Sequence, residues 1–230
     1  MKFIILLLLF PLQGYSQKTN FYEEDTKVNL FAFIGQKISI EEFDPNLDNQ
    51  KTIIEIDKNT GDTVTTVRTS YSMDRAFIAK YKVIQPVFNN LKQDTISFAV
   101  YDHYGTPEFA EFKNVILYIS AYSEEGKSGY YHQKYQFDPV FVNSQGNWTA
   151  IFTFRNVSSH DTALKIKSFP INTNLFDEDI SDYNQEYINI AFPKPFYKIK
   201  NNIAKPVLGT TIKNVFEERK QRVFKPEGLF

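Results

Sequence analysis

The chain has 230 residues, a formal charge of −1 and no cysteine. A nearly neutral chain with scattered basic residues lacks the positive surface that nucleic acid or anionic lipid attracts, so no nucleic-acid partner is expected. The absence of cysteine excludes a disulfide framework and the attachment residue of a bacterial lipoprotein. Aromatic residues make up 16% of the chain, and because each buries a large apolar area, packing alone can stabilise a sizeable core.

The first residues predict a signal peptide over residues 1–16. Lys2 precedes an apolar run at positions 3–10, and Gly14 and Ser16 are the small residues expected before a cleavage site. The run is much shorter than the roughly 20 apolar residues of a membrane-spanning helix. We therefore expect cleavage after Ser16, with cleavage after Gln17 as the alternative. The product would be exported to the periplasm or beyond the cell, with no transmembrane segment left.

The signal ending in Ser-Gln, together with many Asn, Lys, Ile, Phe and Tyr residues, resembles the exported proteins of the Bacteroidota. This resemblance implies a bacterial source and a location, and it implies no activity. The two Asn-x-Ser/Thr sequons, at Asn147 and Asn156, are then incidental.

The hydrophobic pattern repeats every two residues through the middle of the chain. In the segment 77–84, Phe77 and Tyr81 fall on one face while Lys80 and Lys82 fall on the other, as in a strand with one solvated face. The same alternation predicts strands at 148–154 and 163–169, and continuously apolar runs rich in β-branched and aromatic residues predict buried strands at 95–101 and 115–122.

Turn-forming residues separate these strands at short intervals. The segments 57–63, 123–129 and 143–147 each contain glycine with Asn, Asp or Ser neighbours, which is typical of hairpin turns. No long amphipathic helix lies between the strands, so a parallel α/β fold is disfavoured. We predict an all-β fold, an antiparallel β-sandwich-like domain with an open barrel as the alternative.

The C-terminal third of the chain differs in composition from the rest. Residues near 172–206 are acidic and contain prolines, and we expect an irregular segment there. A short helix is predicted at 211–223, with Asn214 and Glu217 at capping-box spacing and Glu218 and Arg222 as an i,i+4 pair. Because no linker composition occurs, one mainly-β domain is expected over 17–230, with a boundary near residue 70 as the alternative.

The segment Phe98–Phe109 holds the first group of candidate functional residues. Asp102 and His103 would lie at the exit of a strand, and Glu108 follows a Gly-Thr-Pro turn that can bring it back toward them. His132 is the residue that a neighbouring hairpin would bring to His103. The alternative is structural, with Asp102 accepting backbone N–H groups in its own turn and His103 exposed to solvent.

Motifs for most other chemistries are missing. The sequence has no His-x-His or His-Glu-x-x-His pair, no Gly-x-Ser-x-Gly elbow and no phosphate-binding glycine loop. The acidic segment 177–182 lacks the glycine and ligand spacing of a calcium loop. No metal and no cofactor are therefore expected, and the balance is against an enzyme without excluding one.

Aromatic residues provide the second group of candidates. Tyr130, Tyr131, Tyr135 and Trp148 lie near polar residues, and exposed aromatic rings of this kind stack on sugars or hold peptides. Adjacent Tyr130 and Tyr131 must face opposite sides of a strand, so one of them is expected on the surface. The function expected from the sequence is a binding or cell-envelope interaction module for a carbohydrate, a peptide or another envelope protein. The alternative is a hydrolase or lyase using Asp102, His103 and Glu108.

Overall fold

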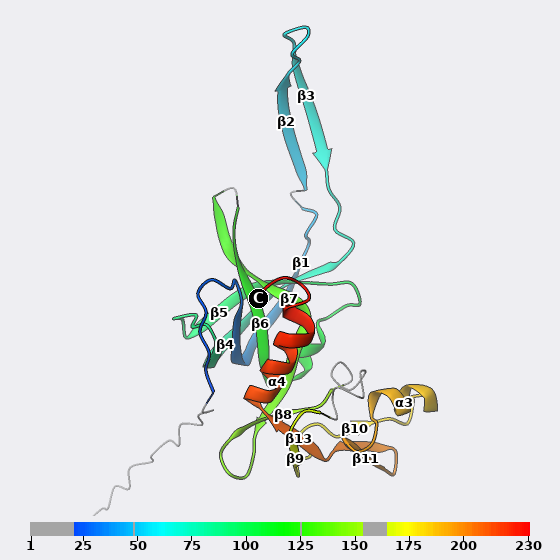
Figure 1. Cartoon of the computed structure of the whole chain (residues 1–230). Coiled ribbons are helices and arrows are strands. Elements are labelled where there is room, and N and C mark those ends of the chain that lie inside the picture. Colours follow the sequence, from blue (N-terminus) through cyan, green and yellow to red (C-terminus); the bar gives the residue numbers. More distant parts are fainter. Residues whose placement is uncertain (1–20, 48, 125, 154–164) are drawn as a thin grey trace, which may run out of the picture.

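The computed structural model describes residues 21–47, 49–124, 126–153 and 165–230 (Figure 1). The predicted signal peptide and the sequon at Asn156 lie outside these ranges. The structure is mostly antiparallel β, with 50% of the described residues in strands and 12% in helices, and it has a large sheet and one short C-terminal helix. The predicted fold class is therefore confirmed.

Eight strands form the large sheet in the order β5-β4-β1-β6-β7-β8-β13-β9. Their bounds are Phe31–Phe43 (β1), Arg75–Phe88 (β4), Thr95–Asp102 (β5), Asn114–Glu124 (β6), Lys127–Val142 (β7), Trp148–Ile151 (β8), Ser168–Pro170 (β9) and Leu208–Thr211 (β13). A parallel bridge between Ala99 of β5 and Tyr131 of β7 brings the edge strand β5 beside β7. The sheet thus curls over itself, although the barrel is not closed.

Irregularities in β1 explain how the sheet can curl so strongly. The register between β1 and β4 shifts at three places along β1, and such bulges bend a strand and increase its twist. Gly35 lies at one of these shifts, where a Cβ atom would approach Phe33 to 2.9 Å and Tyr81 to 3.0 Å. Glycine is therefore required because two aromatic rings pack directly against the backbone.

The inner face of the curled sheet encloses one hydrophobic cluster. It consists of Phe33, Phe77, Ala79, Tyr81, Leu91, Ile96, Phe98, Val100, Phe109, Val115, Leu117, Ile119 and Phe137. Alternation along β4 confirms the predicted strand, because Phe77, Ala79 and Tyr81 are buried while Lys80 and Lys82 are exposed. Phe109 comes from the 3-10 helix η1 (Glu108–Glu111) and fills the interior.

The outer face of the sheet is covered by the C-terminal helix α4 (Ile212–Arg219), which continues as a π-helical turn, η2 (Lys220–Phe224) (Figure 1). Ile212, Val215 and Phe216 are buried against the sheet. The ion pair between Glu218 and Arg222 is confirmed, at 2.7 Å.

The helix begins next to residue 211, as predicted, but its capping residues differ from the prediction. The N-cap is Thr211, whose hydroxyl oxygen accepts a hydrogen bond from the Asn214 N–H at 3.2 Å. The predicted capping box at Asn214 and Glu217 is therefore wrong, because the N-cap lies about one turn before Asn214. Threonine is itself a favoured N-cap residue, and the strand β13 ends at this same residue.

The segment 172–206 is more ordered than its composition predicts. It contains β10 (Glu178–Asp179), the helix α3 (Gln185–Ala191), β11 (Tyr197–Lys200) and β12 (Ile203–Pro206). The three strands form a small sheet in the order β10-β12-β11. A third hydrophobic cluster lies here, consisting of Phe152, Ile180, Ile188, Phe196, Tyr197 and Ala204.

The strand predicted at 163–169 falls partly outside the described residues, and its described part is extended only from Ser168. None of the described helices combines the length and hydropathy needed to cross a bilayer.

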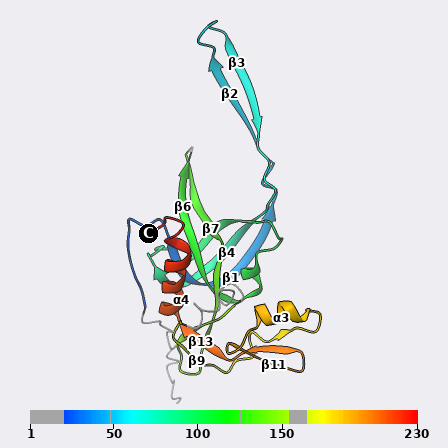
Figure 2. The ribbon, with the colours of Figure 1, turned by 45° about the vertical axis from the view of Figure 1, so that its right-hand side comes forward.

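A hairpin stands away from the body of the molecule (Figures 1 and 2). Its strands are β2 (Gln50–Ile56) and β3 (Thr63–Thr69), on either side of the predicted turn. The hairpin is an insertion between β1 and β4, which pair with each other in the large sheet. A domain boundary near residue 70 would therefore separate two neighbouring strands of one sheet.

Candidate functional site

The predicted group Asp102, His103, Glu108 and His132 is only partly brought together. Asp102 ends β5, and its Oδ1 accepts a hydrogen bond from the Tyr104 N–H at 2.8 Å, which is the structural role of an Asp in a turn. The His103 side chain is 58% exposed, and its Nδ1 lies 3.3 Å from Asp74 Oδ1. His103 therefore contacts Asp74 at the surface and does not line the hollow that the other three residues share.

Asp102, Glu108 and His132 do line a common hollow, but its volume is only about 10 Å³. This is space for at most about one water. The His132 ring is buried, with its Nε2 donating to the Gln136 carbonyl at 2.8 Å and its centroid 4.8 Å from that of Phe109. These contacts make His132 part of the inner packing, with no room beside it for a substrate.

The described residues contain no group of three or more His, Asp or Glu side chains that could hold a metal ion. The acidic segment 177–182 is included in this statement. Asp179 instead accepts hydrogen bonds from the Ser181 hydroxyl and N–H, and these bonds lower the pKa of its carboxyl group.

The four candidate aromatic residues lie in different environments. Tyr131 is the exposed member of the adjacent pair, at 38%, while Tyr130 packs against Phe31 with a centroid distance of 5.7 Å. Tyr135 is half-buried, with its ring 5.9 Å from that of exposed Tyr104. Trp148, at the start of β8, is buried in the hydrophobic cluster that also contains Ile212, Val215 and Phe216 of α4. The four rings therefore do not form one stacking surface.

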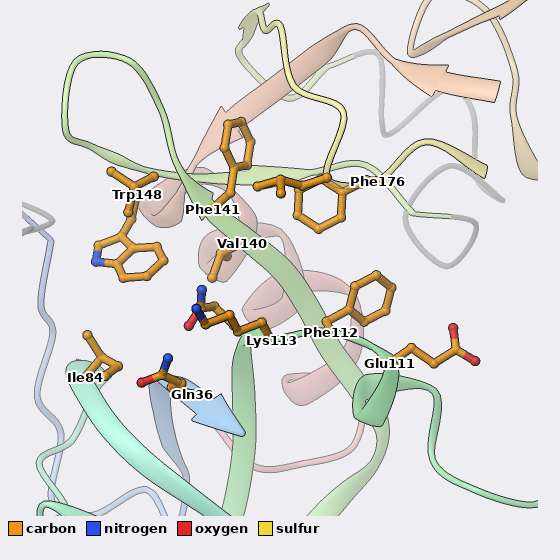
Figure 3. A pocket seen from close by; sticks show the side chains of 12 residues that line it. Gln36, Ile84, Glu111, Phe112, Lys113, Val140, Phe141, Trp148 and Phe176 are labelled. Atoms are coloured by element: carbon orange, nitrogen blue, oxygen red, sulfur yellow. The ribbon is translucent and has the colours of Figure 1, made fainter. Parts of the chain in front are cut away.

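A cavity of about 570 Å³ opens beside Trp148, within the range of roughly 300–1,000 Å³ typical of ligand pockets. It lies where the start of β6, the end of β7 and the start of β8 meet. The lining residues are Gln36, Ile84, Glu111, Phe112, Lys113, Asn114, Val140, Phe141, Val142, Trp148, Leu175 and Phe176. Figure 3 shows Trp148 and Ile84 on one side of the cavity and Phe112 and Phe176 on the other.

Aromatic rings form much of the cavity wall. The ring centroid of Phe176 lies 6.1 Å from that of Phe112 and 5.7 Å from that of Phe141. Phe176 thus connects the turn before β6 with the end of β7. Rings at such separations support one another and leave an apolar face toward the cavity.

Amide and charged groups interrupt this apolar wall. Gln36 of β1 and Asn114 of β6 are direct cross-strand partners, so two amides lie side by side. Each amide can donate and accept hydrogen bonds. Lys113 adds a donor and Glu111 adds an acceptor. The cavity therefore offers both kinds of hydrogen-bonding partner beside aromatic rings.

The indole N–H of Trp148 is buried, and no acceptor for it is found among the described residues. Leaving a buried donor without a partner costs about 1–3 kcal/mol. Trp148 also lines a second hollow of about 530 Å³ on the side of the 143–147 turn. Because the indole nitrogen is itself buried, an acceptor in either hollow would reach it only if neighbouring side chains moved.

Sequence reasoning selected Trp148 but missed the rest of the cavity. Gln36, Asn114 and Phe176 lie in segments with ordinary strand or loop patterns, and only the fold brings them together. The sequence carried no signal for Gln36, because β1 is buried on both faces from Ala32 to Gly35 and its burial does not alternate there.

A buried electrostatic cluster, also missed from the sequence, holds α4 to the sheet. Arg219 donates from Nη2 to Asp138 Oδ1 at 2.8 Å and from Nε to Oδ2 at 3.2 Å, and the Tyr118 hydroxyl donates to Oδ2 at 2.8 Å. Burial acts to lower the pKa of Arg219, but the charge of Asp138 outweighs it and the pKa is raised. Burial and the same charge raise the pKa of Tyr118. All three residues are buried, and the contacts are structural.

Comparison with protein-family models, with curated proteins and with solved structures finds no match to this chain.

Proposed function

We propose that this protein is an exported binding module that holds a neutral, hydroxyl-rich ligand, with a sugar unit as the best chemical match, in the cavity beside Trp148. The observation that carries the proposal is the lining of the cavity of about 570 Å³, which combines aromatic rings with the paired amides of Gln36 and Asn114. Export is inferred from the N-terminal sequence pattern.

The lining favours a sugar over a charged ligand. Sugar rings present C–H faces that pack on aromatic rings and hydroxyls that both donate and accept hydrogen bonds. The rings of Phe112, Phe141 and Phe176 provide the first kind of contact. The amides of Gln36 and Asn114 provide the second. Glu111 and Lys113 have opposite charges, so the lining has no charge excess that would select an ion.

The acid–base alternative has weaker support. A catalytic His103 needs a cleft in which a substrate can reach it, and His103 lies on the surface beside Asp74. The hollow that Asp102, Glu108 and His132 share holds at most about one water. We therefore propose a binding function without a hydrolytic step.

Intrinsic fluorescence tests the proposal directly, because Trp148 is the only tryptophan. Titration with neutral disaccharides, such as maltose, cellobiose and diacetylchitobiose, is expected to give a saturable change in intensity or wavelength for at least one of them. Gln36→Met should raise its Kd about tenfold, the equivalent of one lost hydrogen bond. Gln93→Met, at an exposed position outside the cavity, should leave the Kd unchanged. A flat titration with every disaccharide up to about 10 mM, a Kd near the weak limit of specific binding, would refute the proposed ligand class.

A further inference from the structure

The hairpin β2–β3 is a two-stranded ribbon without a covering layer. Among the described strands, β2 and β3 pair only with each other. All their residues are exposed except Ile53, which is half-buried. An isolated two-stranded hairpin is marginally stable in water. The ribbon would therefore gain stability from additional strands.

The two faces of the ribbon differ in charge. Strand alternation and the observed register assign one face these side chains: Gln50, Thr52, Ile54, Ile56, Thr63, Thr65, Val67 and Thr69. None of them is charged, and Ile54 and Ile56 are 68% and 70% exposed. The charged residues Lys51, Glu55 and Arg68 all lie on the opposite face.

The edge of β2 carries two charged residues, Lys51 and Glu55, but lacks the other features that usually prevent strand pairing. Proteins protect exposed edges with charged side chains, proline, bulges or very short strands. β2 has seven residues and no proline, and its register with β3 is continuous from Gln50 to Ile56. The edge can therefore accept another antiparallel strand along its whole length.

We propose that two copies of this chain associate by pairing their β2 edges in antiparallel orientation, around a two-fold axis at Ile53. Charge complementarity supports a second copy as the occupant. Full overlap of the two strands places Lys51 of each copy opposite Glu55 of the other, and it places Thr52 opposite Ile54. Opposite charges facing each other across two strands are stabilising. The symmetric contact forms both pairs twice, as an isologous interface does.

The edge of β3 matches itself less well. Full overlap of two β3 strands around Thr66 places Val64 opposite Arg68, so no ion pair forms between the two copies. Pairing through β2 forms a four-stranded sheet in the order β3-β2-β2-β3. Its uncharged faces join into one surface, while the charged face carries the ion pairs.

The shape of the molecule permits this arrangement. The hairpin projects well beyond the body in both views (Figures 1 and 2), so an antiparallel pair leaves the two bodies at opposite ends. Hydrogen bonds between Asn46 and Ser72 tie the two connecting segments together at the base. A strand of this length extends only about 24 Å, and the contact is smaller than the roughly 800 Å² per partner of a standard interface. The association is therefore reversible and depends on concentration.

Sedimentation velocity of the purified chain from about 1 to about 200 µM, the range in which so small an interface would form, tests the proposal. The wild type should shift from monomer to dimer. Ile53→Lys places two like charges opposite each other at the axis and should abolish the dimer. Thr66→Lys is the matched control, because Thr66 is the cross-strand partner of Ile53 on the same face but lies on the outer strand. It should leave the Kd of the dimer unchanged.

A charge swap identifies the pairing. Lys51→Glu and Glu55→Lys should each raise the dimer Kd about tenfold or more, and the double variant should restore it. Lys51 faces Arg68 across its own hairpin, so Lys51→Glu also changes contacts within one copy, and rescue by the double variant separates the pairing between copies from this local effect. A wild type that stays monomeric at every concentration, a dimer abolished only by Thr66→Lys, or a double variant without rescue would each overturn the proposal.

Discussion

Two aspartates in this protein each accept hydrogen bonds from cationic or neutral donors, one in the interior and one on the surface. Asp138 is fully buried and is held by Arg219 and Tyr118. Asp74 is bonded to Lys134 at 2.5 Å and lies 3.3 Å from His103, with the latter two side chains 45% and 58% exposed. The two aspartates make similar hydrogen bonds, but the partners of Asp138 are buried and those of Asp74 are open to solvent.

This difference in burial determines how strongly each cluster contributes to the stability of the fold. A buried ion pair contributes little net stability over an apolar pair, but the loss of one partner leaves an unpaired charge away from water. An exposed pair is surrounded by water that can replace either partner. The Asp138 cluster should therefore be sensitive to single substitutions, and the Asp74 cluster should tolerate them.

The largest expected effect is that of Asp138→Asn. The substitution leaves Arg219 buried without its counter-ion, and we expect the free energy of unfolding to fall by about 3–5 kcal/mol. Urea denaturation followed by circular dichroism measures this change. The double variant Asp138→Asn with Arg219→Met removes the unpaired charge and should recover most of the loss. If the double variant were no more stable than the single one, the damage would come from packing and not from charge.

A smaller effect is expected at alkaline pH. Burial raises the pKa of Tyr81, Tyr118 and Tyr197 above the usual value of 10.0. The unfolded chain therefore loses these protons above about pH 10 while the folded chain keeps them. The stability they contribute is complete below pH 10 and is lost as the pH rises toward their folded pKa values.

Each such tyrosine adds at most about 1.4 kcal/mol per pH unit to the rate at which the free energy of unfolding falls with pH. Tyr118→Phe should reduce the slope of unfolding free energy against pH between about pH 10 and 11 by up to this amount. The matched control is Tyr104→Phe, because Tyr104 is 86% exposed. Equal slopes for the wild type and Tyr118→Phe would contradict the assignment of Tyr118 as a buried neutral phenol.

The sequence predicted the features that depend on neighbouring residues. Alternation in β4 identified the buried residues Phe77 and Tyr81, and the residue types around Asp102 indicated a turn. The sequence did not predict the contact between Asp138 and Arg219, which are 81 residues apart. An aspartate in a strand is normally solvated, and nothing nearby in the chain indicates that an arginine from a distant helix will meet it.

The candidate site was hidden for the same reason. Trp148 was selected as an aromatic residue near polar ones, but its burial follows from α4 lying over β8. Gln36 and Asn114 become neighbours only through the register between β1 and β6. Register is set by the hydrophobic pattern of the whole sheet and by its bulges, so it cannot be predicted from the sequence of a single strand.

The smallest expected effect is that of Asp74→Asn. The hydrogen bond from Lys134 lowers the pKa of Asp74, so any stability that it contributes is present above the unfolded pKa of 3.8 and is lost as the pH falls through the folded value. Solvent screens this cluster, and we expect the urea midpoint at pH 7 to be unchanged. Because His103 lies in the same surface cluster, the substitution should also leave the Trp148 fluorescence titration unchanged. A loss of ligand binding in Asp74→Asn, with stability intact, would give Asp74 and His103 the functional role that the exposed position of His103 argues against.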